Sequence, residues 1–244
     1  MVDFCGAQVA PGAICFRKED DLGIVLKRTS IKAGGPQENR SAADRKPREK
    51  RWSEILKAAA EVFHEKGYDA ATLQDIADRV GILKGSIYYY IKTKGDLLDS
   101  LLVEVHKEGL AMIRECAATP GTVFDKLEAM IRGHVDYMSR NRAKTAVYLH
   151  ELKALDTAHR EALFSPHEFR DEFLSLIKQG QREELILAEL DPKLTAQSML
   201  GWINSLYQWY RPQPRKSHTA IANHFMTTML RGIASNKGLK LLEK

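Results

Sequence analysis

The chain has 244 residues, of which 44% are hydrophobic and 28% are charged, and its formal net charge is +5. This balance is typical of a folded globular protein and excludes collagen, a small disulfide scaffold or a chain that is disordered throughout. No apolar run reaches the roughly 18 residues that a transmembrane helix needs. The length allows one large domain or two modest ones.

The ends of the chain and its cysteines indicate the compartment. The start lacks the basic stretch of a secretory signal peptide, and Pro11 and Gly12 interrupt the mildly apolar segment that follows. The three cysteines, Cys5, Cys15 and Cys116, form no CxxC pair and no plausible disulfide framework. We therefore expect a protein of the reducing cytoplasm, without a membrane partner.

Positive charge gathers in one segment of the chain. Residues 1–44 carry six basic and six acidic side chains, whereas residues 45–96 carry eleven basic against eight acidic ones. The densest basic run extends from Arg45 to Arg51. A basic patch beside a folded segment suggests a polyanionic partner, and the run is either an arm that touches DNA or simply a solubilising segment.

Residues 1–44 have several glycines, two prolines and no sustained hydrophobic period. We expect them to form a mostly unstructured extension. The next methionine after Met1 is Met112, too late to begin a domain that starts near residue 45. A second hypothesis is therefore that the extension results from the choice of start site.

From residue 45 onward the hydrophobic period is helical. The first helix runs to about residue 66, with Pro47 in its first turn and Gly67 after its last. A short second helix opens at Thr72, which forms a capping box with Asp75. Gly81 ends that helix, and a short third one follows near residues 83–89.

A long fourth helix opens at a second capping signature, which runs from Thr93 to Asp96. Five further helices are expected near residues 122–140, 143–155, 166–187, 191–210 and 217–234. The fold class is thus all-α, with about nine helices and no strand period after residue 44. We predict a three-helix helix-turn-helix domain at residues 45–96 and a helical domain at residues 97–244.

Two short helices around a tight turn at Gly81 make a helix-turn-helix candidate, in which the second helix enters the major groove of DNA. The residues from Thr72 to Ile82 and from Lys84 to Lys94, with the preceding AAAEVF and Gly67-Tyr68, resemble the TetR family of bacterial transcriptional regulators. The close resemblance covers residues 48–102. It implies double-stranded DNA as a partner and a palindromic operator as the site.

The start of the third helix has the chemistry for DNA contact. Lys84 can donate to guanine, Ser86 to a base edge or phosphate, and Gly85 lets the backbone approach closely. Thr72 and Lys94 stand at helix N-termini, which favour phosphate. Three consecutive tyrosines cannot all be core, although Tyr88 alone could be. The resemblance implies that these residues contact DNA: Thr72, Lys84, Gly85, Ser86, Tyr88, Tyr89, Tyr90 and Lys94.

Three positions depart from the usual pattern of the family: Leu83, Ile91 and Gly95. Leu83 stands where a small polar or acidic residue often caps the third helix. Its lack of a capping oxygen costs about 1 kcal/mol if nothing compensates. In exchange, Leu83 offers an apolar contact to a thymine methyl group.

The last two long helices are apolar on two sides, so each must be covered on two sides. One cover is the core of the monomer, and the other is a second subunit, as the resemblance implies. Two-fold symmetry of a homodimer suits a palindromic operator; the alternative is a helix pair buried inside a monomer. We assign the dimer interface to Met199, Leu206, Trp209, Ile221, Phe225 and Met229.

The resemblance also implies a pocket for a small-molecule effector in the C-terminal domain. Each lining residue is otherwise an ordinary core or surface residue. The segment from Trp209 to Pro212 looks like one in some repressors of steroid and acyl-CoA catabolism, which favours a large hydrophobic or CoA-linked effector. The candidate lining residues are His134, Tyr137, Tyr148, Phe169, Phe173 and Trp202.

The sequence has no HExxH, GxSxG, P-loop or GxGxxG motif, so we expect neither an enzyme nor a bound metal or cofactor. We predict a dimeric repressor that its effector releases from the operator. One alternative is a nucleoid-associated or cell-division protein on the same scaffold without an effector. Another is a small-molecule sensor or enzyme with degenerate DNA binding, against which Lys84, Tyr89 and Lys94 argue.

Overall fold

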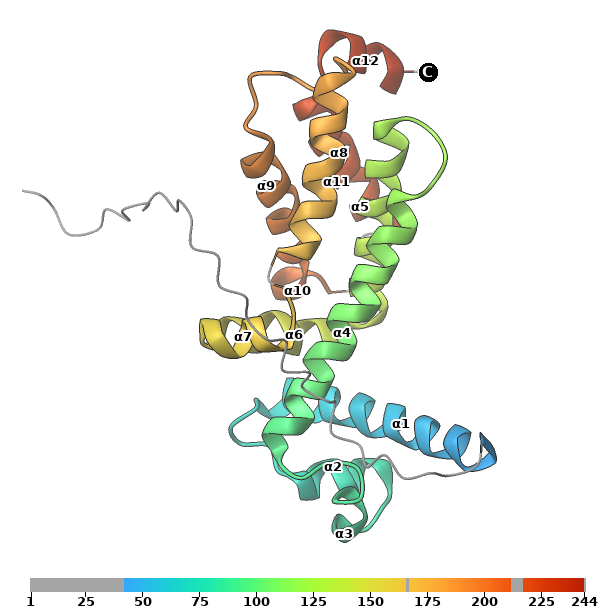
Figure 1. The fold of residues 1–244 in the computed structure, drawn as a ribbon, viewed down its shortest axis with the longest axis vertical. Coiled ribbons are helices and arrows are strands. Elements are labelled where there is room, and N and C mark those ends of the chain that lie inside the picture. The colour runs from blue at the N-terminus through green and yellow to red at the C-terminus, as the bar shows by residue number, and fades with distance from the viewer. Residues whose placement is uncertain (1–41, 166, 212–216, 244) are drawn as a thin grey trace, which may run out of the picture. The chain divides into compact units, whose positions relative to one another are not determined.

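The computed structural model describes residues 42–165, 167–211 and 217–243 (Figure 1). The expected extension at residues 1–44 lies outside the described residues, except that Ala42 to Asp44 begin the first helix. The helices in the described ranges are α1 (Ala42–Lys66), α2 (Leu73–Val80), α3 (Lys84–Ile87), α4 (Lys94–Ala117), α5 (Val123–Arg140), α6 (Arg142–Ala154), α7 (Thr157–Leu163), α8 (Glu168–Arg182), α9 (Pro192–Asn204), α10 (Leu206–Trp209), α11 (His218–Ile233) and α12 (Asn236–Leu242).

Each of the nine expected helices has a counterpart among these twelve. Two of the additional ones, α7 and α12, have only seven residues each. The third arises because the helix expected at 191–210 is divided into α9 and α10 at Ser205, whose hydroxyl donates to the carbonyl of Trp202 at 2.7 Å. An isolated antiparallel bridge between Ile186 and Ala234 is the only β-pairing within the described ranges.

The first helix begins earlier than its sequence suggests. Since α1 starts at Ala42, Pro47 lies inside the helix and not in its first turn. The basic run from Arg45 to Arg51 is therefore part of a helix rather than a flexible arm.

An N-terminal core joins α1, α2 and α3 to the first half of α4. Its fully buried side chains include Ile55 of α1, Ile76 of α2 and Leu101 of α4. Val147 and Tyr148 of α6 belong to the same core. The helix-turn-helix segment is thus packed against residues of both α4 and α6.

A C-terminal core is formed by α5, α8, α9, α10 and α11, and α5 packs on both α4 and α11. The far end of α4 enters this core through Ile113, so α4 contributes to both cores without a break (Figure 1). None of the helices in the described ranges is long and apolar enough to cross a membrane.

Candidate functional site

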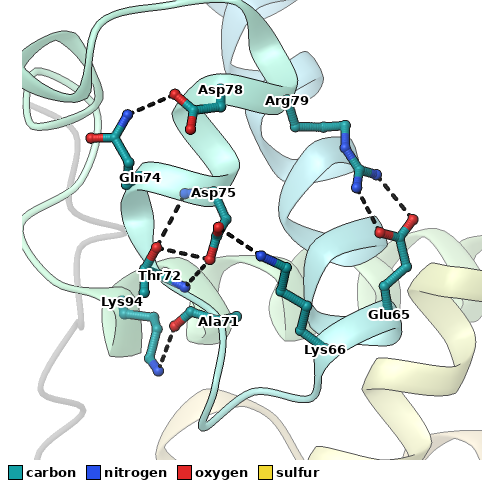
Figure 2. A network of polar contacts seen from close by, with 9 residues as sticks. All are labelled: Glu65, Lys66, Ala71, Thr72, Gln74, Asp75, Asp78, Arg79 and Lys94. Carbon is teal, nitrogen blue, oxygen red and sulfur yellow. Dashed lines mark hydrogen bonds and ion pairs between the residues drawn. The ribbon is translucent and has the colours of Figure 1, made fainter.

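Backbone capping fixes the helix-turn-helix unit. Thr72 Oγ1 accepts from the backbone N–H of Asp75 at 3.1 Å, and the Asp75 carboxylate accepts from the N–H of Thr72 at 3.0 Å, which confirms the expected capping box (Figure 2). Gly81 adopts a left-handed conformation with φ of 73°, which a residue with a side chain rarely tolerates. These two local devices set where α2 begins and ends, and hence where α3 can start.

Ion pairs hold α2 against α1. Lys66 donates to Asp75 at 2.7 Å, and Arg79 forms two hydrogen bonds with Glu65 at 3.1 and 2.6 Å (Figure 2). The hydrogen bonds from Lys66 and Thr72 lower the pKa of Asp75 to about 2, so this carboxylate is ionised whenever the protein is folded near neutral pH. The pairs are exposed, so they orient α2 more than they stabilise the fold.

The third helix presents an exposed surface that mixes apolar, aromatic and basic groups. Leu83 and Tyr89 are 81% and 77% exposed, Tyr88 is 51% exposed, and Lys84 is also exposed. Ile87 is fully buried and attaches the helix to the N-terminal core. This is an arrangement that can enter a groove of DNA, because bulky side chains surround a basic one on a helix that its own core holds in place.

The backbone of α3 is open at Gly85, where a Cβ atom would have nothing within 4 Å. Ser86 is partly buried, and its carbonyl accepts from the N–H of Tyr89. As expected from the residue type, Leu83 at the N-cap makes no side-chain capping hydrogen bond. An exposed Leu83 without a capping role is available for an apolar contact.

Tyr90 differs from its two neighbours. Its ring stacks on Trp52 of α1 with an interplanar angle of 11°, and the guanidinium of Arg48 lies 5.9 Å from the ring centroid. The sequence favoured Tyr90 over Tyr88 as an outward group, but Tyr88 is exposed and Tyr90 packs on α1. The reason is that α3 is a single turn, after which the chain bends back towards α1.

Lys94 is engaged inside the protein. Its ammonium group donates to the carbonyls of Tyr68, Asp69 and Ala71 at 2.8, 3.1 and 2.9 Å. An ammonium group has three N–H bonds, so all of them are used. The side chain therefore fastens the loop before α2 to the start of α4, and only the backbone of Lys94 remains available for a phosphate.

The candidate effector residues divide into two groups. His134, Tyr137, Tyr148 and Phe169 lie around the middle of α4, with contacts described below. Phe173 is fully buried in the C-terminal core. Trp202 is 49% exposed and lies against Phe225, with ring centroids 6.3 Å apart, so it belongs to a different surface.

A histidine that sequence reasoning missed stands at the centre of the first group. His106 Nδ1 lies 2.9 Å from the Tyr148 hydroxyl, and Nε2 lies 3.0 Å from a carboxylate oxygen of Glu168. Its ring stacks on Phe164 with centroids 4.2 Å apart. Burial lowers the pKa of His106. The helical period from Leu102 to position 106 was a signal that could have found it.

Since a carboxylate only accepts hydrogen bonds, Nε2 of the neutral His106 donates to Glu168. Nδ1 then accepts from the hydroxyl of Tyr148, which is itself part of the N-terminal core. Burial raises the pKa of Tyr148, so the hydroxyl keeps its proton. A chain of two hydrogen bonds thus leads from the first turn of α8, through α4, to α6.

A second chain lies nearby. Tyr137 donates to Glu108 at 2.9 Å, and Lys144 donates to Glu104 and Glu108 at 2.7 and 3.4 Å. Burial and the neighbouring Glu108 raise the pKa of Tyr137. These contacts connect α5 and α6 to α4, and the Glu168–His106 hydrogen bond connects α8 to it, so three helices around the candidate site are bonded to α4.

His134 is buried, and its Nδ1 atom has no hydrogen-bond partner within the described residues. Burial lowers the pKa of His134 to about 4, which leaves the ring neutral near pH 7. An unpaired buried polar atom costs free energy, so it is a place where a partner is missing.

The expected dimer residues are mostly interior. Met199, Leu206, Ile221 and Met229 are buried within the monomer, which corrects their assignment to an interface. When a helix carries two apolar stripes, the sequence alone does not say which one faces inward. The other two expected residues lie outward: Trp209 is 50% exposed and lies against the partly buried Phe225.

Comparisons with known proteins agree with this architecture. Residues 55–101 match the model of bacterial regulatory proteins of the tetR family, and residues 120–233 match the tetracyclin repressor-like C-terminal domain. A relative, the HTH-type transcriptional repressor KstR2 of Rhodococcus jostii, is 27% identical over 187 residues, which are 76% of this chain and 92% of the relative.

Two solved structures share the fold. A transcriptional regulator of the TetR/AcrR family from Thermobifida fusca is 30% identical, with a TM-score of 0.59 over 75% of this chain and 98% of that one. AibR, solved in complex with isovaleryl coenzyme A and operator DNA, is 22% identical, with a TM-score of 0.64 over 73% of this chain and 97% of that one. These similar proteins are transcriptional regulators, and this chain belongs to the TetR family of bacterial regulatory proteins.

Proposed function

We propose that this protein is a transcriptional repressor, not an enzyme, that binds a palindromic operator as a homodimer in the cytoplasm. A small hydrophobic or acyl-CoA-like effector releases it. The observation that carries the proposal is the exposed surface of α3, where Leu83, Lys84, Tyr88 and Tyr89 project from a helix-turn-helix unit of the TetR family. Residues 45–96 form the DNA-binding domain, and residues 97–244 bind the effector and the second subunit.

Within the DNA-binding domain we assign roles by what each side chain is free to do. Lys84, Gly85 and Ser86 approach the bases, and Tyr88 and Tyr89 contact the backbone or the groove wall. The side chains of Thr72 and Lys94 are engaged in the protein, so their contacts to phosphate come from backbone N–H groups of the first helical turn. The Tyr90 ring supports α1, which leaves its hydroxyl as the only contact group.

We place the effector among the residues around the middle of α4: His134, Tyr137, Tyr148 and Phe169, joined by His106. Two properties support this site, namely the unpaired buried Nδ1 of His134 and the hydrogen-bonded connections to α6 and α8. The relatives support the mode of regulation and the effector class: KstR2 is a repressor, and AibR was solved with isovaleryl coenzyme A and operator DNA.

Release of DNA then follows from a shift between two conformations. The effector favours a state in which the two α3 helices of the dimer no longer match successive major grooves, and it does so only by binding that state more tightly. The helix that transmits the change is α4, since it enters both cores without a break.

The second subunit covers the aromatic surface formed by Trp202, Trp209 and Phe225. Next to Trp202, Gly201 has open space around its Cβ position, so another helix can approach closely there. Replacing both tryptophans by alanine is expected to convert the dimer to monomer in sedimentation experiments, with retained helicity. A double variant that stays dimeric would move the interface elsewhere.

The test of the proposed function is DNA selection with the purified full chain, followed by gel shifts on the selected sequence and on the region upstream of its own coding sequence. We expect a two-fold symmetric site and a loss of binding on addition of acyl-CoA thioesters. A genome-wide binding profile separates this function from the nucleoid-associated alternative. A regulator occupies few promoter sites, whereas many dispersed sites without any effector response would favour the alternative.

A further inference from the structure

One phenylalanine occupies an unusual place in the candidate effector site. Phe169 lies in the first turn of α8, and its ring presses on α4 where that helix has Gly109. A Cβ atom at position 109 would lie only 3.0 Å from Phe169 Cζ. A side chain at position 109 would therefore crowd the ring, which lies between Gly109 of α4 and His134 of α5.

The same ring lies between two histidines. Its centroid is 5.1 Å from that of His106, edge-on, and 6.2 Å from that of His134. Phe169 is only partly buried, so the space that it occupies reaches the surface, whereas the neighbouring His134 is 7% exposed. If the ring is removed, the space that it leaves borders the rings of His106 and His134.

We propose that Phe169 occupies the site of the effector itself, and that the effector has an apolar ring or chain that replaces this side chain and a neutral oxygen that hydrogen-bonds Nδ1 of His134. The proposal rests on the proposed function and adds the chemical class of the ligand. A carbonyl accepts from Nδ1–H and a hydroxyl donates to the unprotonated nitrogen, so either group satisfies the unpaired atom.

The neutral state of His134 restricts the ligand further. Because its pKa is lowered to about 4, His134 offers a carboxylate no positive charge near neutral pH. The two arginines near the first turn of α8 are already paired, Arg114 with Glu168 and Glu172, and Arg170 with Asp171. The group that reaches His134 is therefore neutral.

Replacement of the ring has a direct route to the DNA-binding domain. Phe169 adjoins Glu168, which accepts from His106, and His106 accepts from Tyr148 in the N-terminal core. Moving the first turn of α8 to admit a ligand lengthens or breaks the first of these hydrogen bonds. The loss reaches α6, which packs on α1.

The test uses phenol and toluene as probes on full-length Phe169→Ala. Dry apolar cavities of about 150 Å3 bind benzene-sized molecules. We expect either probe, at ten times its dissociation constant, to raise the melting temperature of Phe169→Ala by about 3 °C and to leave the wild type unchanged. Adding His134→Leu should weaken phenol binding by about tenfold and leave toluene binding unchanged. Absence of stabilisation by both probes, or equal weakening of both, overturns the proposal.

Phe124 provides a matched control. It is also a phenylalanine packed on a helical glycine, with its Cζ atom 2.9 Å from the Cβ position of Gly238. In Phe124→Ala the affinity for phenol should not depend on His134. If His134→Leu weakens phenol binding in this background to the same extent, the effect is not local to Phe169 and the proposal fails.

Operator affinity links the site to regulation. Phenol should weaken operator binding by Phe169→Ala at least about tenfold, by analogy with ordinary coupling free energies, and leave Phe124→Ala unaffected. Unchanged operator binding by phenol-saturated Phe169→Ala overturns the regulatory role. If the wild type binds no selected DNA, the proposed function fails, while the probe measurements still decide whether the site exists.

Discussion

The helix-turn-helix unit pairs the polar groups described above, whereas the middle of α4 leaves one buried polar atom, Nδ1 of His134, without a partner among the described residues. Around α2, Thr72 and Asp75 cap each other, and all three N–H bonds of the Lys94 ammonium are satisfied by the preceding loop. Around the middle of α4, His134 is buried with an unpaired nitrogen. His106, whose pKa is lowered by burial, hydrogen-bonds Tyr148 and Glu168.

The difference follows from what each region has to do. A surface that recognises DNA gains from side chains fixed before binding, because less conformational entropy is lost on contact. A site that responds to a ligand needs hydrogen-bonding or apolar groups that have no partner in the free protein. The ligand then makes contacts in one state that it does not make in the other, and this difference shifts their populations. Variants that exchange these properties test the comparison.

The largest effect is expected from the exposed surface of α3. Lys84→Ala combined with Tyr89→Ala should weaken operator binding by at least about a hundredfold, because each base or phosphate contact contributes about 1–3 kcal/mol. Fluorescence anisotropy measures the affinity. Circular dichroism and sedimentation should show an unchanged fold and dimer, and Lys57→Ala on the exposed side of α1 serves as the control. Unchanged affinity would remove α3 from the interface.

Protonation of His134 should lower the free energy of unfolding at acidic pH. Its folded-state pKa of about 4 lies below the usual 6.5, so between these values the unfolded chain binds a proton that the folded one does not. The free energy of unfolding is therefore full above pH 6.5 and falls as the pH decreases, by about 2 kcal/mol at pH 5. Urea unfolding at pH 7.5 and pH 5 measures the difference, which His134→Leu should reduce. An identical pH dependence in the variant would contradict the assignment.

Removing the Lys94 ammonium should loosen the helix-turn-helix unit. Lys94→Met leaves three carbonyl groups without their donor and is expected to cost about 2 kcal/mol of unfolding free energy. Chemical denaturation measures the loss, and Lys92→Met on the exposed surface nearby should be neutral. If Lys94→Met kept full stability but lost DNA affinity, the ammonium would act on phosphate and not on the loop.

The capping hydroxyls should have the smallest effects. Thr72→Ala and Thr93→Ala each remove the acceptor for an N–H of the first helical turn and should cost about 1 kcal/mol. Thermal unfolding should show a decrease of about 3 °C for either variant. Serine keeps the hydroxyl, so Thr72→Ser and Thr93→Ser should restore most of the loss, and failure to do so would point to a role of the methyl group.

Local signals explain what the sequence could predict. The capping residues Thr72 and Thr93 both have the expected roles, because a cap depends on residues only three positions away. Gly81 likewise takes the left-handed conformation that its place after α2 indicated. The order of the nine expected helices followed from such helix starts and ends together with the helical period.

Contacts between distant segments explain what could not be predicted. The partners of Lys94 are 23 to 26 positions away, and Glu168 lies 62 positions from His106. No pattern within a helix shows these pairings. The same is true of Met199 and Met229. They are buried because α9 and α11 turn the faces that carry them towards the C-terminal core, whereas the face of α9 that carries Trp202 is exposed.

The fastening of Lys94 has a mechanical consequence for the DNA-binding domain. The residue that begins α4 is bonded to the loop that leads into α2, and the capping box at Thr72 begins α2 one residue after that loop. These hydrogen bonds couple α4 to the helix-turn-helix unit, so we expect a rotation of α4 about its axis to turn α2 and α3 with it. A small rotation at the C-terminal end of α4 is thus expected to reorient α2 and α3 together at its N-terminal end.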